Sequence, residues 1–81
     1  MDILQLTKDE FVKNNRIGIG LNIRKYRKKK SFSQQHLADL MGISRATISK
    51  IENGKFAISV DYLAKFAWHL DFDLALNENE N

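Results

Sequence analysis

Residues 33–55 carry apolar side chains at helical spacing, in two short runs separated by Gly42. A serine precedes each run, Ser33 and then Ser44, and a serine hydroxyl at this position can accept a backbone N–H of the first helical turn. Gly42 suits the left-handed residue that commonly ends a helix. The pattern therefore predicts two short helices joined by a tight turn, with the second ending at Gly54. The residues expected to face inward are Leu37, Ala38, Met41, Ile43, Ile48 and Ile51.

The outer face of the second predicted helix carries small and cationic side chains. At about 100° per residue, Ala46, Ser49, Lys50 and Asn53 project away from the apolar face, and Arg45 lies at the N-terminal tip. A helix with such a face can enter the major groove of DNA. From spacing alone, an ordinary pair of helices with a solvated outer face fits at least as well.

A longer helix is predicted before this pair, from Ile17 to Lys30, although Gly18 and Gly20 lower the helix propensity at its start. Residues 24–30 include six lysines and arginines. Cations at a helix C-terminus interact favourably with the helix dipole, and they can also contact DNA phosphates. Both interpretations apply to Lys28. The predicted core stripe of this helix is Ile19, Ile23 and Tyr26.

The first sixteen residues are predicted to form an arm and a short helix. Thr7 and Glu10 fit a capping box, which predicts a helix from about Lys8 to Asn14 that buries Phe11 and Val12. The pair of asparagines at 14 and 15 is expected to break this helix.

The last predicted helix runs from Val60 to about Leu70 after the cap Ser59, and a strand follows it. Between residues 71 and 77, apolar and mostly polar residues alternate, which is strand spacing. Two aromatic residues off the inward stripe, Tyr62 and Trp68, favour a protein interface. The expected inward stripe of the helix is Val60, Leu63, Phe66, Ala67 and Leu70, and the apolar face of the strand is Phe72, Leu74 and Leu76.

Composition limits the classes of protein that this chain can represent. A length of 81 residues suits one small domain, and the lack of cysteine excludes disulfides and thiolate zinc sites. No apolar run approaches the roughly 20 residues that cross a bilayer, and no secretory signal is evident. The serines are explained as caps, and neither histidine has an evident orienting carboxylate. We therefore expect a cytoplasmic protein that is not an enzyme and needs no cofactor or membrane.

The net charge of +3 hides a strong asymmetry along the chain. Residues 13–55 carry eleven lysines and arginines against two acidic residues, a balance of +9. Residues 1–12 carry a balance of −2, and residues 56–81 a balance of −4. A basic middle with acidic ends suits a polyanion that binds one face of the molecule.

Together these residues resemble the Cro/C1-type (XRE) helix-turn-helix family of transcription regulators, over about Ile17 to Leu70. The resemblance implies an all-α, lambda-repressor-like bundle of four to five helices that binds operator DNA. It also implies that Gln34, Ser44 and Asn53 touch the DNA backbone or place the helix, and that Arg27 and Glu52 form an internal ion pair. The resemblance rests on Ser33-Gln34, Leu37-Ala38, Gly42-Ile43-Ser44, Thr47-Ile48-Ser49 and Ile51-Glu52-Asn53-Gly54.

Candidate DNA contacts follow from side-chain chemistry on the second predicted helix. Arg45 is the best reader of bases because its guanidinium can bond the O6 and N7 atoms of guanine together. Lys50 lies about one turn later, and the methyl groups of Ala46 and Thr47 can contact thymine, although Thr47 could instead be half-buried. The residues expected to meet phosphates through their charge are Lys28 and Lys55.

We therefore divide the chain into an N-terminal arm or short helix (1–16), a DNA-binding domain (17–70) and a C-terminal strand with a polar tail (71–81). The expected function is that of a repressor, which binds a palindromic operator as a homodimer. The expected dimer interface is the strand, with Phe72, Leu74, Leu76 and the nearby Trp68. The strand also resembles the ending of HipB-type antitoxins, so the alternative is a module that binds a kinase-like toxin.

Overall fold

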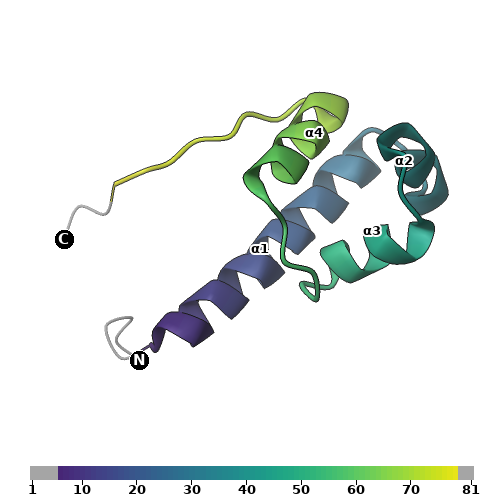
Figure 1. Cartoon of the computed structure of the whole chain (residues 1–81). Helices are drawn as coiled ribbons and strands as arrows, with labels where there is room; N and C mark the ends of the chain where they lie inside the picture. Colours follow the sequence, from purple (N-terminus) through teal and green to yellow (C-terminus); the bar gives the residue numbers. More distant parts are fainter. Residues whose placement is uncertain (1–5, 79–81) are drawn as a thin grey trace.

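The computed structural model describes residues 6–78 and contains four helices (Figure 1). In chain order these are α1 (Lys8–Lys29), α2 (Gln34–Met41), α3 (Arg45–Glu52) and α4 (Val60–Leu70). The expectation of an all-α bundle is correct, and the described residues include no strand. No helix in this part of the chain is long and apolar enough to cross a membrane.

All four helices begin at the residues that the sequence marks as caps. The side chains of Thr7, Ser33, Ser44 and Ser59 each accept the backbone N–H of the residue three positions along. At Thr7 the Glu10 carboxylate also reaches back, which completes the predicted capping box. Local hydrogen bonding by the chain itself therefore sets where each helix starts.

The N-terminal region differs from the prediction, because Lys8–Lys29 is one continuous helix with no break at the asparagines. Asn15 stays inside the helix, where its side-chain amide donates to the carbonyl oxygen of Phe11 at 2.9 Å. An asparagine costs little in a helix interior, and no left-handed residue ends the helix here. The predicted boundary at residue 16 thus falls within α1. Phe11 and Val12 are not buried either, since they are 50% and 43% exposed.

The core lies between the four helices, where α1 and α2 each pack against α3 and against α4. The side chains that are almost completely buried are Ile23, Leu37, Ala38, Ile48, Ile51, Phe66 and Leu70. These residues agree with the predicted inward faces. Two other residues of α4, Val60 and Tyr62, differ from the prediction in how far they are buried. Val60, the first residue of α4, is 76% exposed, because no other element covers that end of the helix. Tyr62 is half-buried, with its ring 6.0 Å from those of both Phe56 and Phe66.

Helix α1 approaches the end of α3 so closely that only a glycine fits between them. A Cβ atom added to Gly20 would lie 2.3 Å from the carbonyl oxygen of Ile51 and 2.8 Å from that of Glu52. Gly20 is buried in the middle of a regular helix. Its role is therefore steric, and it brings α1 against the backbone of α3.

The chain after α4 begins with two anchored residues and then leaves the body. Asp71 ends α4 in a left-handed conformation and forms an ion pair with Lys30. The ring of Phe72 stacks on Tyr26, with the ring centres 5.0 Å apart. Beyond this point the chain extends away from the body (Figure 1), and Leu74 and Leu76 are 46% and 101% exposed. The predicted strand is not present within the described chain, because no neighbouring segment there pairs with it.

Candidate nucleic-acid interface

Helices α2 and α3 form a helix-turn-helix around three residues, Gly42 to Ser44. Gly42 takes the left-handed conformation, with a φ of 69°, and ends α2. Ile43 then donates its backbone N–H to the carbonyl oxygen of Ala38 at 3.0 Å and packs its half-buried side chain on the core. Ser44 caps α3. The turn therefore fixes the direction in which α3 leaves α2.

Helix α3 buries one face and presents the other to solvent. Ile48, Ile51 and Glu52 are buried, whereas the predicted base readers Arg45, Ala46 and Lys50 are exposed. The structure thus brings these three side chains to one free surface, as their spacing predicts.

Two predicted contact residues at the start of α3 are bonded to each other. The Ser44 and Thr47 hydroxyl oxygens lie 2.8 Å apart, and the Ser44 oxygen also accepts the Thr47 backbone N–H at 3.1 Å. Thr47 is half-buried. Its hydroxyl therefore has a local hydrogen-bond partner, and the half-burial that the sequence left open for this residue is what the structure shows.

The end of α3 carries two more predicted contact residues. The Asn53 side-chain amide donates to the carbonyl oxygen of Ser49 at 2.9 Å, and the Lys55 backbone N–H donates to that of Lys50 at 2.8 Å. Both Asn53 and Lys55 are exposed. Gly54 between them takes a left-handed conformation, so the Lys55 N–H bond closes the C-terminus of α3.

A buried ion pair connects α1 to α3. The Nε and Nη2 atoms of Arg27 donate to the two carboxylate oxygens of Glu52 at 2.6 and 3.0 Å. Arg27 and Glu52 are only 7% and 4% exposed. A third nitrogen of Arg27 donates to the carbonyl oxygen of Phe32 at 2.8 Å. Two fixed hydrogen bonds in parallel hold the pair in one geometry, and this is the ion pair that the sequence analysis expects.

The same carboxylate holds Gln34 at the start of α2. The side-chain amide of Gln34 donates to Glu52 Oε1 at 3.1 Å and is part-buried. Glu52, which lies on α3, thus connects this helix to both α1 and α2. Sequence reasoning missed this bond, since residues 34 and 52 lie far apart along the chain.

The basic end of α1 is only partly free. Lys28 is exposed, and no ion pair in the described residues involves it, whereas Lys30 pairs with Asp71. Lys28 is therefore the better placed of these two lysines to meet a phosphate.

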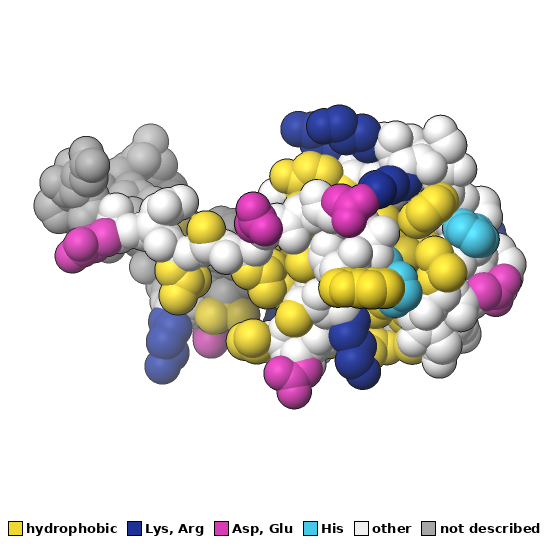
Figure 2. Space-filling view, turned by 90° about the horizontal axis from the view of Figure 1, so that it is seen from above, with side chains coloured by type: hydrophobic (Ala, Val, Ile, Leu, Met, Phe, Trp, Pro, Cys, Tyr) yellow, Lys and Arg dark blue, Asp and Glu magenta, His cyan; other side chains and the backbone are white. Residues whose placement is uncertain are grey.

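The residues predicted for a dimer interface lie on α4 and on the segment after it. Trp68 is 78% exposed. Figure 2, which views the molecule from above Figure 1, shows hydrophobic side chains on the body and along the extended segment, with acidic side chains between them. Phe72 differs from Leu74 and Leu76, because it packs on the core of its own chain.

The described residues contain no group of three or more His, Cys, Asp or Glu side chains that could hold a metal ion.

Comparisons with known proteins agree with this geometry. The helix-turn-helix family profile matches residues 23–76. The ImmF control region 10 kDa protein of Bacillus phage phi105 is 36% identical over 56 residues, which span 69% of this chain and 62% of that protein. The crystal structure of the restriction-modification controller protein C.AhdI from Aeromonas hydrophila is similar, with a TM-score of 0.69 and 30% identity over 74% of this chain and 91% of that one. The chain thus belongs to the helix-turn-helix family of the Cro/C1 (XRE) type, whose members are DNA-binding transcription regulators.

Proposed function

We propose that this protein binds specific double-stranded DNA sequences through α3 and acts as a transcription repressor. The observation that carries the proposal is the exposed outer face of α3, with Arg45, Ala46 and Lys50 together on it. The hydrogen bonds of Arg27 and Glu52 hold this helix against α1. A rigid scaffold matters because base contacts depend on where the side chains are placed.

The side chains of the outer face of α3 and its surroundings suggest which residues contact bases and which contact the DNA backbone. Arg45 presents a planar fork that fits the two acceptors of guanine in the major groove. Lys50 extends the reading surface by about one turn. The residues assigned to the DNA backbone, which position the protein and add salt-dependent affinity, are Gln34, Ser44, Asn53, Lys55 and Lys28.

A single α3 reads only a few base pairs, so the proposal includes a two-fold dimer on a palindromic site. A dimer that occupies the major groove over a promoter excludes polymerase, which is the physical basis for repression. The relatives' names support a regulator, since they describe a control-region protein and a controller protein. These names do not favour the alternative of an antitoxin that binds a kinase-like toxin.

The division between base and phosphate contacts predicts different behaviour for two single variants. Arg45→Ala should cost roughly 1–3 kcal/mol on the selected site and relax the preference at one base pair. Lys28→Ala should weaken binding to selected and scrambled duplexes by the same factor, because a phosphate contact carries no sequence information. Titrations of both variants on both duplexes measure this, and equal losses on the two duplexes for Arg45→Ala would remove Arg45 from the reading role.

We propose that the dimer depends on the segment after α4, in which Phe72 to Leu76 pairs with the same segment of a second copy. An extended segment with no neighbour has unsatisfied N–H and C=O groups, and a two-fold axis supplies an identical strand. Removing residues 71–81 should therefore give a monomer that binds a palindromic site much more weakly. Sedimentation and DNA titration of this truncated chain measure both properties. A truncated chain that sediments as a dimer and binds fully would contradict the pairing.

A further inference from the structure

The apolar stripe of α1 continues beyond the part of the helix that the body covers. Ile23 is 1% exposed, and Ile19 and Tyr26 pack against the core. Val12 lies about two turns before Ile19 on the same side of the helix and is 43% exposed. Phe11, beside it, is 50% exposed. A helix that presents such a stripe to water normally has an element packed on it.

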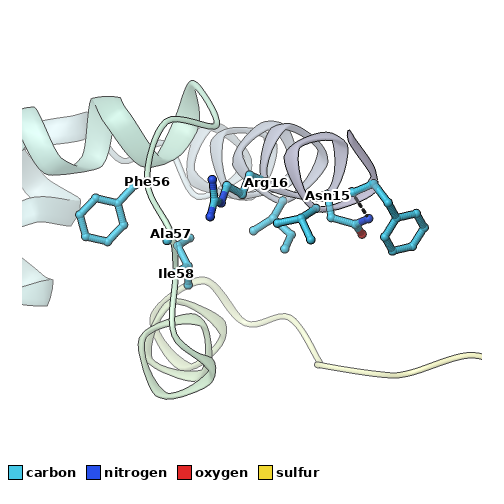
Figure 3. Close-up of a pocket in the computed structure, with 8 residues that line it drawn as sticks. Asn15, Arg16, Phe56, Ala57 and Ile58 are labelled. Carbon is cyan, nitrogen blue, oxygen red and sulfur yellow. Dashed lines mark hydrogen bonds between the residues drawn. The ribbon is translucent and has the colours of Figure 1, made fainter. Parts of the chain in front are cut away.

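The uncovered stripe borders two hollows that share Asn15 and Ile19. The first, of about 280 Å³, lies between α1 and the loop residues Phe56 to Ile58. Figure 3 shows Asn15 and Arg16 on the helix and Phe56, Ala57 and Ile58 on the facing loop. The second, of about 660 Å³, separates α1 and the start of α4 from residues 72–76. Because two lining residues are common to both, they form one trough along α1, which we call the α1 trough.

The segment after Phe72 has the complementary features, and we call residues 73–78 the tail. Leu76 projects from it fully exposed, and Leu74 is 46% exposed. No backbone–backbone hydrogen bond in the described residues involves the tail. The tail's own residues 73–76 form one wall of the second hollow, opposite α1, and leave the space between them open.

The tail and the α1 trough also match in length and in charge. Six extended residues span roughly 20 Å, and α1 from Phe11 to Ile23 spans roughly 18 Å. The first hollow of the trough carries the cation Arg16, whereas the second is lined by Asp73 of the same chain. The tail carries the acids Asp73 and Glu78, so the first hollow is the part of the trough that their charges match. None of these three charged side chains is among the ion pairs of the described residues.

We propose that the α1 trough receives the tail of a second copy of the chain, with Leu74 and Leu76 in the hollows and the tail acids near Arg16. Two-fold symmetry makes the exchange reciprocal, so each chain gives a tail and receives one. This inference rests on the dimer in the proposed function. It adds the surface that accepts the tail, and it is compatible with pairing of the two tails, whose apolar faces would then cover both troughs.

Because the chain has no cysteine, engineered cysteines can test the contact directly. We would mix two full-length single variants of different mass, Val12→Cys and Leu76→Cys, refold them together and oxidise them. The expected product is a mixed disulfide dimer, identified by mass spectrometry. In the control, Leu40→Cys replaces Val12→Cys. Leu40 lies on α2, at the opposite end of the molecule from the start of α1 (Figure 1), and is similarly exposed at 42%.

Two outcomes would overturn the proposal. In the first, Leu76→Cys forms a mixed dimer with Leu40→Cys as readily as with Val12→Cys. In the second, the only covalent dimers join two Leu76→Cys chains. The absence of any covalent dimer would also overturn it.

A charge placed in the trough provides a second, independent measurement. Val12→Lys should raise the dimer dissociation constant by about tenfold or more, because docking of the tail would bury the new charge. Leu40→Lys should leave dimerisation unchanged. Sedimentation without DNA measures dimerisation, and DNA titration of the same variants measures binding. If Val12→Lys dimerises normally, the docking proposal fails while the proposed DNA-binding function stands; loss of sequence-specific binding by the wild-type chain would instead remove that function.

Discussion

Replacing Glu52 with glutamine is expected to lower the free energy of unfolding by about 3–5 kcal/mol, the usual cost of breaking a buried ion pair by removing one partner. The substitution keeps the shape of the side chain but leaves the Arg27 guanidinium, only 7% exposed, without a counter-charge. Small domains are stable by only about 5–15 kcal/mol. Denaturant unfolding of the purified variant measures the loss.

The loss should depend on burial, which two further variants can test. Asp71→Asn breaks the Lys30–Asp71 pair, whose side chains are 37% and 68% exposed, and should cost less than about 1 kcal/mol. Asparagine tolerates the left-handed conformation of this residue. A double variant, Arg27→Met with Glu52→Met, should recover much of the stability, because no charge is left buried alone. An unchanged unfolding midpoint for Glu52→Gln would show that the pair contributes nothing.

Replacing Gly20 with alanine is expected to destabilise the protein by roughly 1–3 kcal/mol, although alanine is the better helix former. The added Cβ would lie 2.3 Å from the carbonyl oxygen of Ile51, and a backbone atom cannot turn aside as a flexible side chain can. Helix α1 must therefore shift away from α3. Thermal unfolding measures the loss, at about 4–8 °C in Tm for each kcal/mol in a domain of this size.

Gly18 provides the matched control two residues earlier in the same helix. An added Cβ there meets nothing within 4 Å, so Gly18→Ala should stabilise the protein by up to about 1 kcal/mol through helix propensity alone. Opposite signs for the two variants are the expected result. If both raise the Tm, the close approach of α1 and α3 at Gly20 is wrong.

The elements set by local chemistry could be predicted from the sequence. Ser33 and Ser44 cap helices by bonding a residue three positions away, and Gly42 ends α2 through its own backbone conformation. Each of these effects lies within a few residues, where sequence spacing is sufficient. The inward faces of α2 and α3 follow from helical periodicity for the same reason.

Features that depend on neighbours could not be predicted in the same way. The asparagines at 14 and 15 indicate a break only if some residue ends the helix, and none does. Val60 fits the inward stripe, but it is the first residue of α4 and its side chain is left 76% exposed. From the sequence, Gly20 is only a weak helix former, whereas in the structure it lets the backbones of α1 and α3 meet. A glycine inside an otherwise regular helical stripe is a signal that could have indicated this contact.

The candidate site shows the same division. Periodicity predicts the outer face of α3, including Arg45 and Lys50, because it depends on one helix. The bond between Gln34 and Glu52 depends on how three helices are arranged, so it could be found only in the structure.

A binding selection from random duplex DNA would test the claim that α3 reads a DNA sequence. The full-length protein is incubated with a random pool, and the bound duplexes are sequenced. We predict a two-fold symmetric motif whose half-sites lie about one helical turn apart, roughly 34 Å, and one base pair of each half-site should lose its preference when Arg45→Ala is selected in parallel. Binding that enriches no sequence above the starting pool would contradict the claim.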